Sequence, residues 1–138
     1  MKLDEIRSKE ELEYCVDMYM SQNDISFLPA DRDTSIKNLK KAYRNDFVRV
    51  VRDKGVIIAW AWFLRINLPY TDKEFFQQYF YTSNCTGVKA YKCVIMLHEA
   101  AEEEAKRLKI RYLISQGSHM DPHCVFAKML ERQGWQRR

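Results

Sequence analysis

Histidine and cysteine side chains that could hold a metal ion or act as a nucleophile gather in the second half of the sequence. His119, His123 and Cys124 lie close together, and Cys85 and Cys93 fall around a predicted loop. Structural zinc sites use pairs of ligands at short, regular spacings, which this set lacks. Because adjacent residues on a helix do not face each other, His123 is poorly placed to activate Cys124. We therefore expect no metal site, with buried neutral cysteines and exposed histidines instead.

Two lysines, Lys89 and Lys92, lie near the start of a helix that is predicted to begin at about Ala90. Free N–H groups and the positive end of a helix attract phosphate oxygens, so this position suits a phosphorylated ligand. The formal net charge of +4 would help an anion to approach. No aromatic stacking pattern accompanies the basic helix face, so we expect no nucleic-acid partner there. That face consists of Lys37, Lys40, Lys41 and Arg44.

Carboxylates supply the candidates for a general base, which would remove a proton from an attacking amine. Three aspartates fall in the predicted connection between the first two helices: Asp24, Asp31 and Asp33. Asp33 is placed to cap the second helix. Glu74 follows a polar connection and precedes an aromatic strand, and it is the carboxylate that we carry forward as a catalytic candidate.

These residues belong to a chain that reads as a single domain over 1–138. The sequence is 46% hydrophobic and 30% charged, with four glycines, three prolines and no linker-like segment. The longest apolar run, 56–64, is far shorter than the ~20 residues of a membrane-spanning helix, and 1–5 do not form an apolar signal segment. We expect a soluble cytoplasmic protein with reduced cysteines and no membrane partner.

Helical spacing of apolar residues predicts four helices. Ser8 and Glu11 form a capping box, in which the two side chains satisfy free amide donors at a helix start. In the third helix, Glu102 and Lys106 form an i,i+4 pair on the outer face. The four are expected at 8–21, from about Asp33, at 90–108, and from Asp121 and Pro122 to Gly134.

Strand patterns predict five strands, with the order β-α-α-β-β-β-α-β-α along the chain. The segment 56–64 has no polar alternation, so both of its faces should be covered by helices. A strand, a helix and a second strand of these lengths normally form a parallel pair. The strands are expected at 3–7, 47–51, 56–64, 75–83 and 110–115.

The order of these elements resembles that of the GNAT superfamily of acyl-CoA-dependent N-acyltransferases. Two sequence blocks carry the resemblance further, EAAEEEAKRLKIRYL at 99–113 and FAKMLERQGW at 126–135. The resemblance implies an α/β (α+β) fold with a mixed, mostly antiparallel sheet flanked by helices. It also implies acetyl transfer from acetyl-CoA to an amine, with acetyl-CoA in a cleft between the fourth and fifth strands.

The resemblance also implies the residues of the site. The pyrophosphate of acetyl-CoA would lie at the start of the third helix and its thioester beside the fourth strand. The expected acetyl-CoA contacts are Phe80, Tyr81, Thr82, Val88, Lys89, Ala90, Tyr91, Lys92 and His123. The catalytic candidates are Glu74 as base and His119 as a proton donor to the departing thiolate.

The phosphate-binding loop departs from the family pattern Gln/Arg-x-x-Gly-x-Gly/Ala, and two registers are open. If the following helix fixes the register, the three positions hold Val88, Tyr91 and Cys93. If Gly87 is the first glycine, they hold Asn84, Gly87 and Lys89, and the helix is longer than usual.

Two further departures concern the end of the chain. Many family members have a tyrosine four residues before the Gly-aromatic pair, and this chain has Leu130. The sequence stops at Arg138, where the family begins its closing hairpin, so we expect that hairpin to be absent or truncated. Either a second polypeptide, another copy or a different chain, would then cover the edge at 110–115, or Trp135 and the tail 137–138 would fold back over it. The alternative to an enzyme is an inactive scaffold or interaction protein, for instance in a virus particle.

Overall fold

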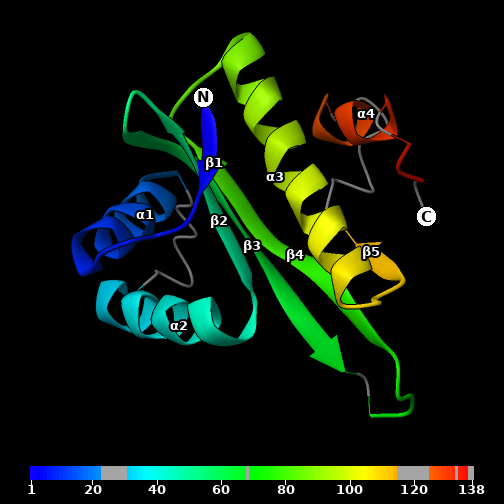
Figure 1. The fold of residues 1–138 in the computed structure, drawn as a ribbon. Coiled ribbons are helices and arrows are strands. Elements are labelled where there is room, and N and C mark those ends of the chain that lie inside the picture. The colour runs from blue at the N-terminus through cyan, green and yellow to red at the C-terminus, as the bar shows by residue number, and fades with distance from the viewer. Residues whose placement is uncertain (23–30, 68, 115–124, 133, 137–138) are drawn as a thin grey trace.

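The computed structural model describes residues 1–22, 31–67, 69–114, 125–132 and 134–136. Within these ranges, a sheet of five strands lies between two layers of helices (Figure 1). The elements are β1 (Lys2–Asp4), α1 (Lys9–Gln22), α2 (Arg32–Asn45), β2 (Phe47–Asp53), β3 (Val56–Asn67), β4 (Glu74–Ser83), α3 (Gly87–Arg107), β5 (Tyr112–Ile114) and α4 (Val125–Arg132). The predicted fold class and element order are confirmed.

The strands follow one another across the sheet in the order β1-β2-β3-β4-β5. The first three pairings are antiparallel, and β4 pairs with β5 in parallel, as the strand-helix-strand pattern predicts. In the part of the chain that the structure describes, β5 therefore lies at one edge of the sheet. The predicted edge position of 110–115 is confirmed for its described residues.

The two faces of β3 carry side chains of different size. Trp60 faces the cluster formed with α1 and α2, whereas Ala59, Ala61 and Phe63 face the cluster formed with α3. Alanines bring the backbone of the sheet close to α3, and the tryptophan fills the wider space on the other side. Both faces of this strand are covered, as its continuous apolar sequence predicts.

The capping box at the start of α1 forms with a small shift. Ser8 Oγ accepts the N–H of Glu11 at 3.2 Å, and Glu11 Oε1 accepts the N–H of Arg7 at 2.8 Å. The strand β1 ends at Asp4 and does not reach the predicted residue 7; the backbone oxygen of Glu5 accepts from Arg52, and the N–H of Arg7 is used by the capping box. The helix begins within one residue of its predicted start.

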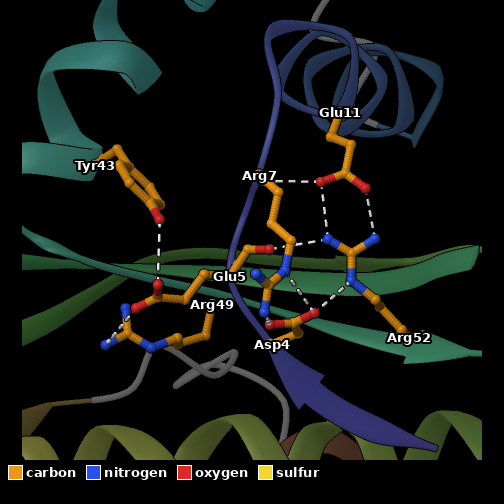
Figure 2. A network of polar contacts seen from close by, with 7 residues as sticks. All are labelled: Asp4, Glu5, Arg7, Glu11, Tyr43, Arg49 and Arg52. Atoms are coloured by element: carbon orange, nitrogen blue, oxygen red, sulfur yellow. Dashed lines mark hydrogen bonds and ion pairs between the residues drawn. The ribbon is translucent and has the colours of Figure 1, made fainter. Parts of the chain in front are cut away.

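Arg52 of β2 joins three segments in the network shown in Figure 2. Its guanidinium donates to both carboxylate oxygens of Glu11, to Asp4 Oδ2 at 2.8 Å and to the backbone oxygen of Glu5 at 2.9 Å. The arginine lowers the pKa of the Glu11 carboxyl, and Arg7 and Arg52 together lower that of Asp4. This network fastens β1 and the start of α1 to the sheet.

Replacing Arg52 with methionine should lower the free energy of unfolding by about 2 kcal/mol, between the effects of exposed and fully buried ion pairs. The reason is that only 11% of the Arg52 side chain is exposed, and its loss leaves Glu11 without its cation. Urea titration measures the change. Arg7→Met is the matched control. The Arg7 side chain is 67% exposed, so its replacement should lower the free energy of unfolding far less. Equal losses in the two variants would contradict the central role of Arg52.

The cap of α2 differs from the sequence prediction. Asp31 is the N-cap, and its carboxylate accepts from the N–H of Asp33 at 3.1 Å and from the hydroxyl of Thr34 at 2.8 Å. The prediction that Asp33 is the cap is therefore wrong by two residues. Both aspartates precede the same apolar pattern, and only the backbone geometry distinguishes them.

Candidate functional site

A β-bulge interrupts β4 in the middle of the sheet. Trp62 of β3 is opposite Phe80, but the next residue, Phe63, is opposite Gln78, so Tyr79 is the extra residue. Bulges of this kind often lie beside active sites, because they redirect side chains and end regular pairing. The bulged residue lies two positions after Gln77, the last residue of β4 that β5 pairs with.

The segment 78–83 of β4 therefore has no β5 partner within the described residues. On that side the segment borders no described strand. Phe80 and Thr82 lie in this segment, opposite Trp62 and Trp60 of β3. Thr82 is buried, at 3% exposure.

The start of α3 lies beside this open segment. Tyr81 donates its hydroxyl to the backbone oxygen of Ala90 at 3.4 Å, which joins β4 to the first turns of the helix. Burial raises the pKa of the Tyr81 hydroxyl, so it stays a donor at neutral pH. The N-cap, Thr86, makes no side-chain hydrogen bond to the helix, and Gly87 has φ of +65°, a conformation that favours glycine.

The helix begins three residues earlier than its predicted start at Ala90. This start favours the register in which Gly87 is the first glycine of the loop. Val88 is 72% exposed, and the side chains of Lys89 and Lys92 are also exposed. Ala90 and Tyr91 are half-buried. The predicted phosphate contacts are thus gathered around one helix start.

Lys89 already has an anionic partner. Its Nζ lies 2.8 Å from Asp53 Oδ2 at the end of β2, and this contact raises the pKa of the ammonium group. The pair is exposed, so the lysine can exchange a surface carboxylate for a phosphate at little cost. Lys89 remains a predicted phosphate contact.

Glu74 lies at the other end of β4. It forms an ion pair with Arg65 across the β3–β4 pairing, and the arginine lowers the pKa of the Glu74 carboxyl. Six residues of strand separate it from Phe80, which is about 20 Å. The structure does not bring Glu74 together with the start of α3. The other catalytic candidate, His119, and the predicted acetyl-CoA contact His123 lie outside the described residues.

The sequence analysis missed His98, which is 2% exposed on the inner face of α3. Its Nδ1 lies 2.8 Å from the backbone oxygen of Val94, and its Nε2 lies 3.1 Å from Oε1 of the buried Gln78. Phe63 and Trp135 contact the ring edge to face. Burial lowers the pKa of His98 to about 4, so the ring is neutral at pH 7. Its burial could have been inferred from the sequence, because it directly follows Leu97 in the stripe of apolar residues on the inner face of this helix.

A cavity of about 80 Å³ lies on the opposite face of the sheet, where α1 and α2 pack. It is lined by Val16, Tyr19, Ser35, Asn38, Leu39, Trp60, Trp62 and Tyr79. Tyr79 is the bulged residue, so the cavity adjoins the open segment of β4. The sequence analysis missed the cavity, because its walls come from four elements that are distant in sequence.

Two other kinds of site were sought in the described residues. No group of three or more histidine, cysteine, aspartate or glutamate residues there could hold a metal ion. No helix in the same ranges has the length and apolar character needed to cross a bilayer. Cys124 of the suggested metal set lies outside these ranges.

Leu130 of α4 is buried, at 6% exposure. Its backbone oxygen accepts the N–H of Trp135 at 3.2 Å, which closes the end of the helix. The side chain has no proton to donate, and its burial is that of a packing residue.

No protein-family model matches the sequence, and no curated protein matches it. Solved structures with the same fold do exist. A probable acetyltransferase superposes with a TM-score of 0.80 at 13% identity, covering 100% of this chain and 91% of that one. The ribosomal-protein-alanine N-acetyltransferase from Brucella melitensis gives 0.77 at 15% identity, covering 99% and 85%.

A third structure, an N-acetyltransferase from Staphylococcus aureus Mu50, gives a TM-score of 0.77 at 17% identity, covering 98% of this chain and 82% of that one. Identities this low establish the likeness of the fold alone. The chain therefore has the fold of the GNAT acetyltransferases.

Proposed function

We propose that this protein is an acyl-CoA-dependent N-acyltransferase that transfers an acetyl group from acetyl-CoA to an amine. The observation that carries the proposal is the start of α3, whose N-cap side chain makes no hydrogen bond to the helix and which lies beside 78–83 of β4. The backbone of this part of β4 can contact the thioester and pantetheine, and the amides of the first turn of α3 can hold the pyrophosphate. The acetyltransferases of the same fold support the choice of chemistry.

The reaction follows from the chemistry of thioesters. The lone pair of the amine attacks the carbonyl carbon, the C–N bond forms, and the C–S bond breaks. The amine loses one proton, and the thiolate of CoA takes one. Backbone N–H groups of 80–82 would stabilise the negative charge that develops on the carbonyl oxygen.

The reaction needs one group to give a proton to the thiolate and another to take a proton from the amine. Leu130 cannot protonate the thiolate, so water or His119 supplies that proton. A thiolate is a good leaving group, since free thiols have a pKa of about 8.5. Glu74, the predicted base, is paired with Arg65 and lies about 20 Å along β4 from Phe80, so water takes the proton of the amine in this proposal. A missing acid or base typically costs about 100- to 10,000-fold in rate, so slow turnover is expected.

Calorimetric titration of the purified chain with acetyl-CoA tests the proposal. We expect binding in the micromolar range, because helix amides and exposed lysines face the phosphates while the loop lacks most of the family's glycines. S-acetylpantetheine is the matched control, since it keeps the thioester and lacks the phosphates, and it should bind at least tenfold more weakly.

Absence of heat at millimolar acetyl-CoA would overturn the proposal. The fold would then serve as a scaffold, and the edge strand β5 would be the expected contact for a second polypeptide, a further copy of this chain or another component of an assembly such as a virus particle.

A further inference from the structure

Two cysteines lie close together at the start of α3. Cys85 precedes the N-cap Thr86 by one residue, and Cys93 lies in the second turn of the helix, in the core cluster between α3 and the sheet. The side chain of Cys85 packs against the same cluster. Both cysteines are free thiols. The helix start therefore carries a pair of thiols that no other part of the site uses.

The side chains of the two cysteines interact directly. Burial raises the pKa of the Cys93 thiol to about 12, together with the charge of Cys85 and a hydrogen bond with the Cys85 side chain. The Cys93 sulfur thus keeps its proton at neutral pH and can donate it to the sulfur of Cys85. Two sulfur atoms that share a hydrogen bond are close to the arrangement from which a disulfide forms.

The two thiols differ in their access to solvent. Cys93 has an exposed fraction of 0%, and its Sγ lies 3.9 Å from Sδ of Met1, at the N-terminus beside α3 (Figure 1). Cys85 is half-buried, and its Sγ lies 3.7 Å from Oγ of Ser83. A small oxidant in solution therefore meets Cys85 first, and Cys93 is placed to react only with the oxidised Cys85.

The surroundings of the pair are those of a reactive cysteine. Lys89 lies near both thiols: after its ion pair with Asp53, their charges are among the causes that raise the pKa of its ammonium group. Cys85 also adjoins the positive end of α3. Reactive cysteines are found at helix starts and next to lysines, because the thiolate is the form that attacks an oxidant.

We propose that Cys85 and Cys93 form a reversible disulfide when the protein meets hydrogen peroxide, so that the start of α3 is a site of redox modification. The Cys85 sulfur attacks one oxygen of the peroxide, the O–O bond breaks, and a sulfenic acid and one water form. The Cys93 sulfur then attacks the Cys85 sulfur, the S–S bond forms, and the oxygen leaves as a second water. Two thiols lose two electrons and two protons, and one peroxide is reduced to two waters. This inference does not depend on the proposed function.

The backbone before the helix allows the two sulfurs to approach bonding distance. The side chain of Thr86 makes no hydrogen bond to the helix, so a shift of Cys85 toward Cys93 breaks no side-chain cap. Gly87 has φ of +65°, and glycine can change its backbone angles at little cost. The disulfide would join the end of β4 to the second turn of α3.

The test is peptide mapping of the purified chain after treatment with millimolar hydrogen peroxide under native conditions. Cys124, which lies outside the described residues, is replaced with serine in every sample. Trypsin cuts after Lys89 and Lys92, so the two cysteines fall in the separate peptides 74–89 and 93–106. We expect mass spectrometry to find these two peptides joined in the monomer, and dithiothreitol to separate them. If the two peptides stay unjoined, or if either is joined to the Cys15 peptide, the proposal is overturned.

Variants separate the roles of the two thiols. In Cys93→Ser, Cys85 should stop at the sulfenic acid, which dimedone traps. In Cys85→Ser, oxidation of Cys93 should be at least about tenfold slower, because solvent does not reach it. Cys15→Ala is the matched control, since Cys15 is also buried and should leave the crosslink unchanged. Equal rates of Cys93 oxidation with and without Cys85 would contradict the assigned order of reaction.

Thermal unfolding shows whether the folded chain accommodates the bond. A disulfide restricts the unfolded chain, so the thermal midpoint of the crosslinked protein should rise by several degrees and return after dithiothreitol. Cys85→Ser treated with peroxide in the same way should show no rise. A lower midpoint in the crosslinked protein would mean that the bond forms only when the start of α3 is distorted, and this result also overturns the proposal.

Discussion

The free energy of unfolding should fall by about 2 kcal/mol as the pH is lowered from 7 to 5, because of His98. Burial lowers the pKa of this ring from 6.5 to about 4 in the folded chain. Between these values the unfolded chain binds a proton that the folded chain does not, so acid favours unfolding. The full effect, reached near pH 4, is about 3 kcal/mol.

Urea titrations at several pH values between 7 and 5 measure this slope. The paired carboxyls of Asp4 and Glu11 have lowered pKa values, so their stabilising effect is lost only at lower pH. His98→Gln is the matched variant, because an amide can hydrogen-bond in the same space and does not titrate. Its stability should change little over this range. An identical slope in both proteins would show that His98 is not the cause.

His98 lies between α3 and β4, so its titration reports on the packing of this helix against this strand. The ring contacts Gln78, which lies one residue beyond the part of β4 that β5 pairs with. The neutral ring carries one N–H, and it faces two oxygens, the Val94 carbonyl at Nδ1 and Gln78 Oε1 at Nε2. His98 therefore holds α3 against β4 at the point where β5 leaves the strand.

The parts of the fold that depend on local sequence could be predicted. The capping box of Ser8 and Glu11 marks a helix start within one turn, and the continuous apolar run of β3 requires cover on both faces. The Arg52 network could not be predicted, because Arg52 is 41 residues from Glu11 and 48 from Asp4. Nothing in the sequence near Arg52 distinguishes it from an exposed arginine.

The candidate site likewise has some features that local sequence predicts and others that arise only from the packing of distant segments. A helix start with nearby lysines is a local pattern, and the structure gathers those predicted residues, although the start lies at Gly87 and not at Ala90. The bulge at Tyr79 is a property of the pairing between two strands, and no residue type in the aromatic run 79–81 marks it. The cavity likewise exists only once α1, α2, β3 and β4 are packed.

Replacing Val88 with aspartate should have opposite effects on folding and on ligand binding. Val88 is 72% exposed in the first turn of α3, so the substitution disturbs no packing. A negative charge near the positive end of a helix stabilises it by about 0.3–1 kcal/mol, and the thermal midpoint should rise slightly. The same charge repels a pyrophosphate bound at the helix start, and the affinity for acetyl-CoA should fall at least tenfold.

The pairing of these two effects makes the test decisive, because a variant that loses affinity by unfolding cannot also gain stability. Val88→Asn keeps the size of aspartate without its charge and should retain most of the affinity for acetyl-CoA. S-acetylpantetheine has no phosphates, so its affinity should be the same for the parent chain and for Val88→Asp. If Val88→Asp binds acetyl-CoA as well as Val88→Asn does, the pyrophosphate does not lie at the start of α3, and the open segment of β4 must be assigned to another ligand.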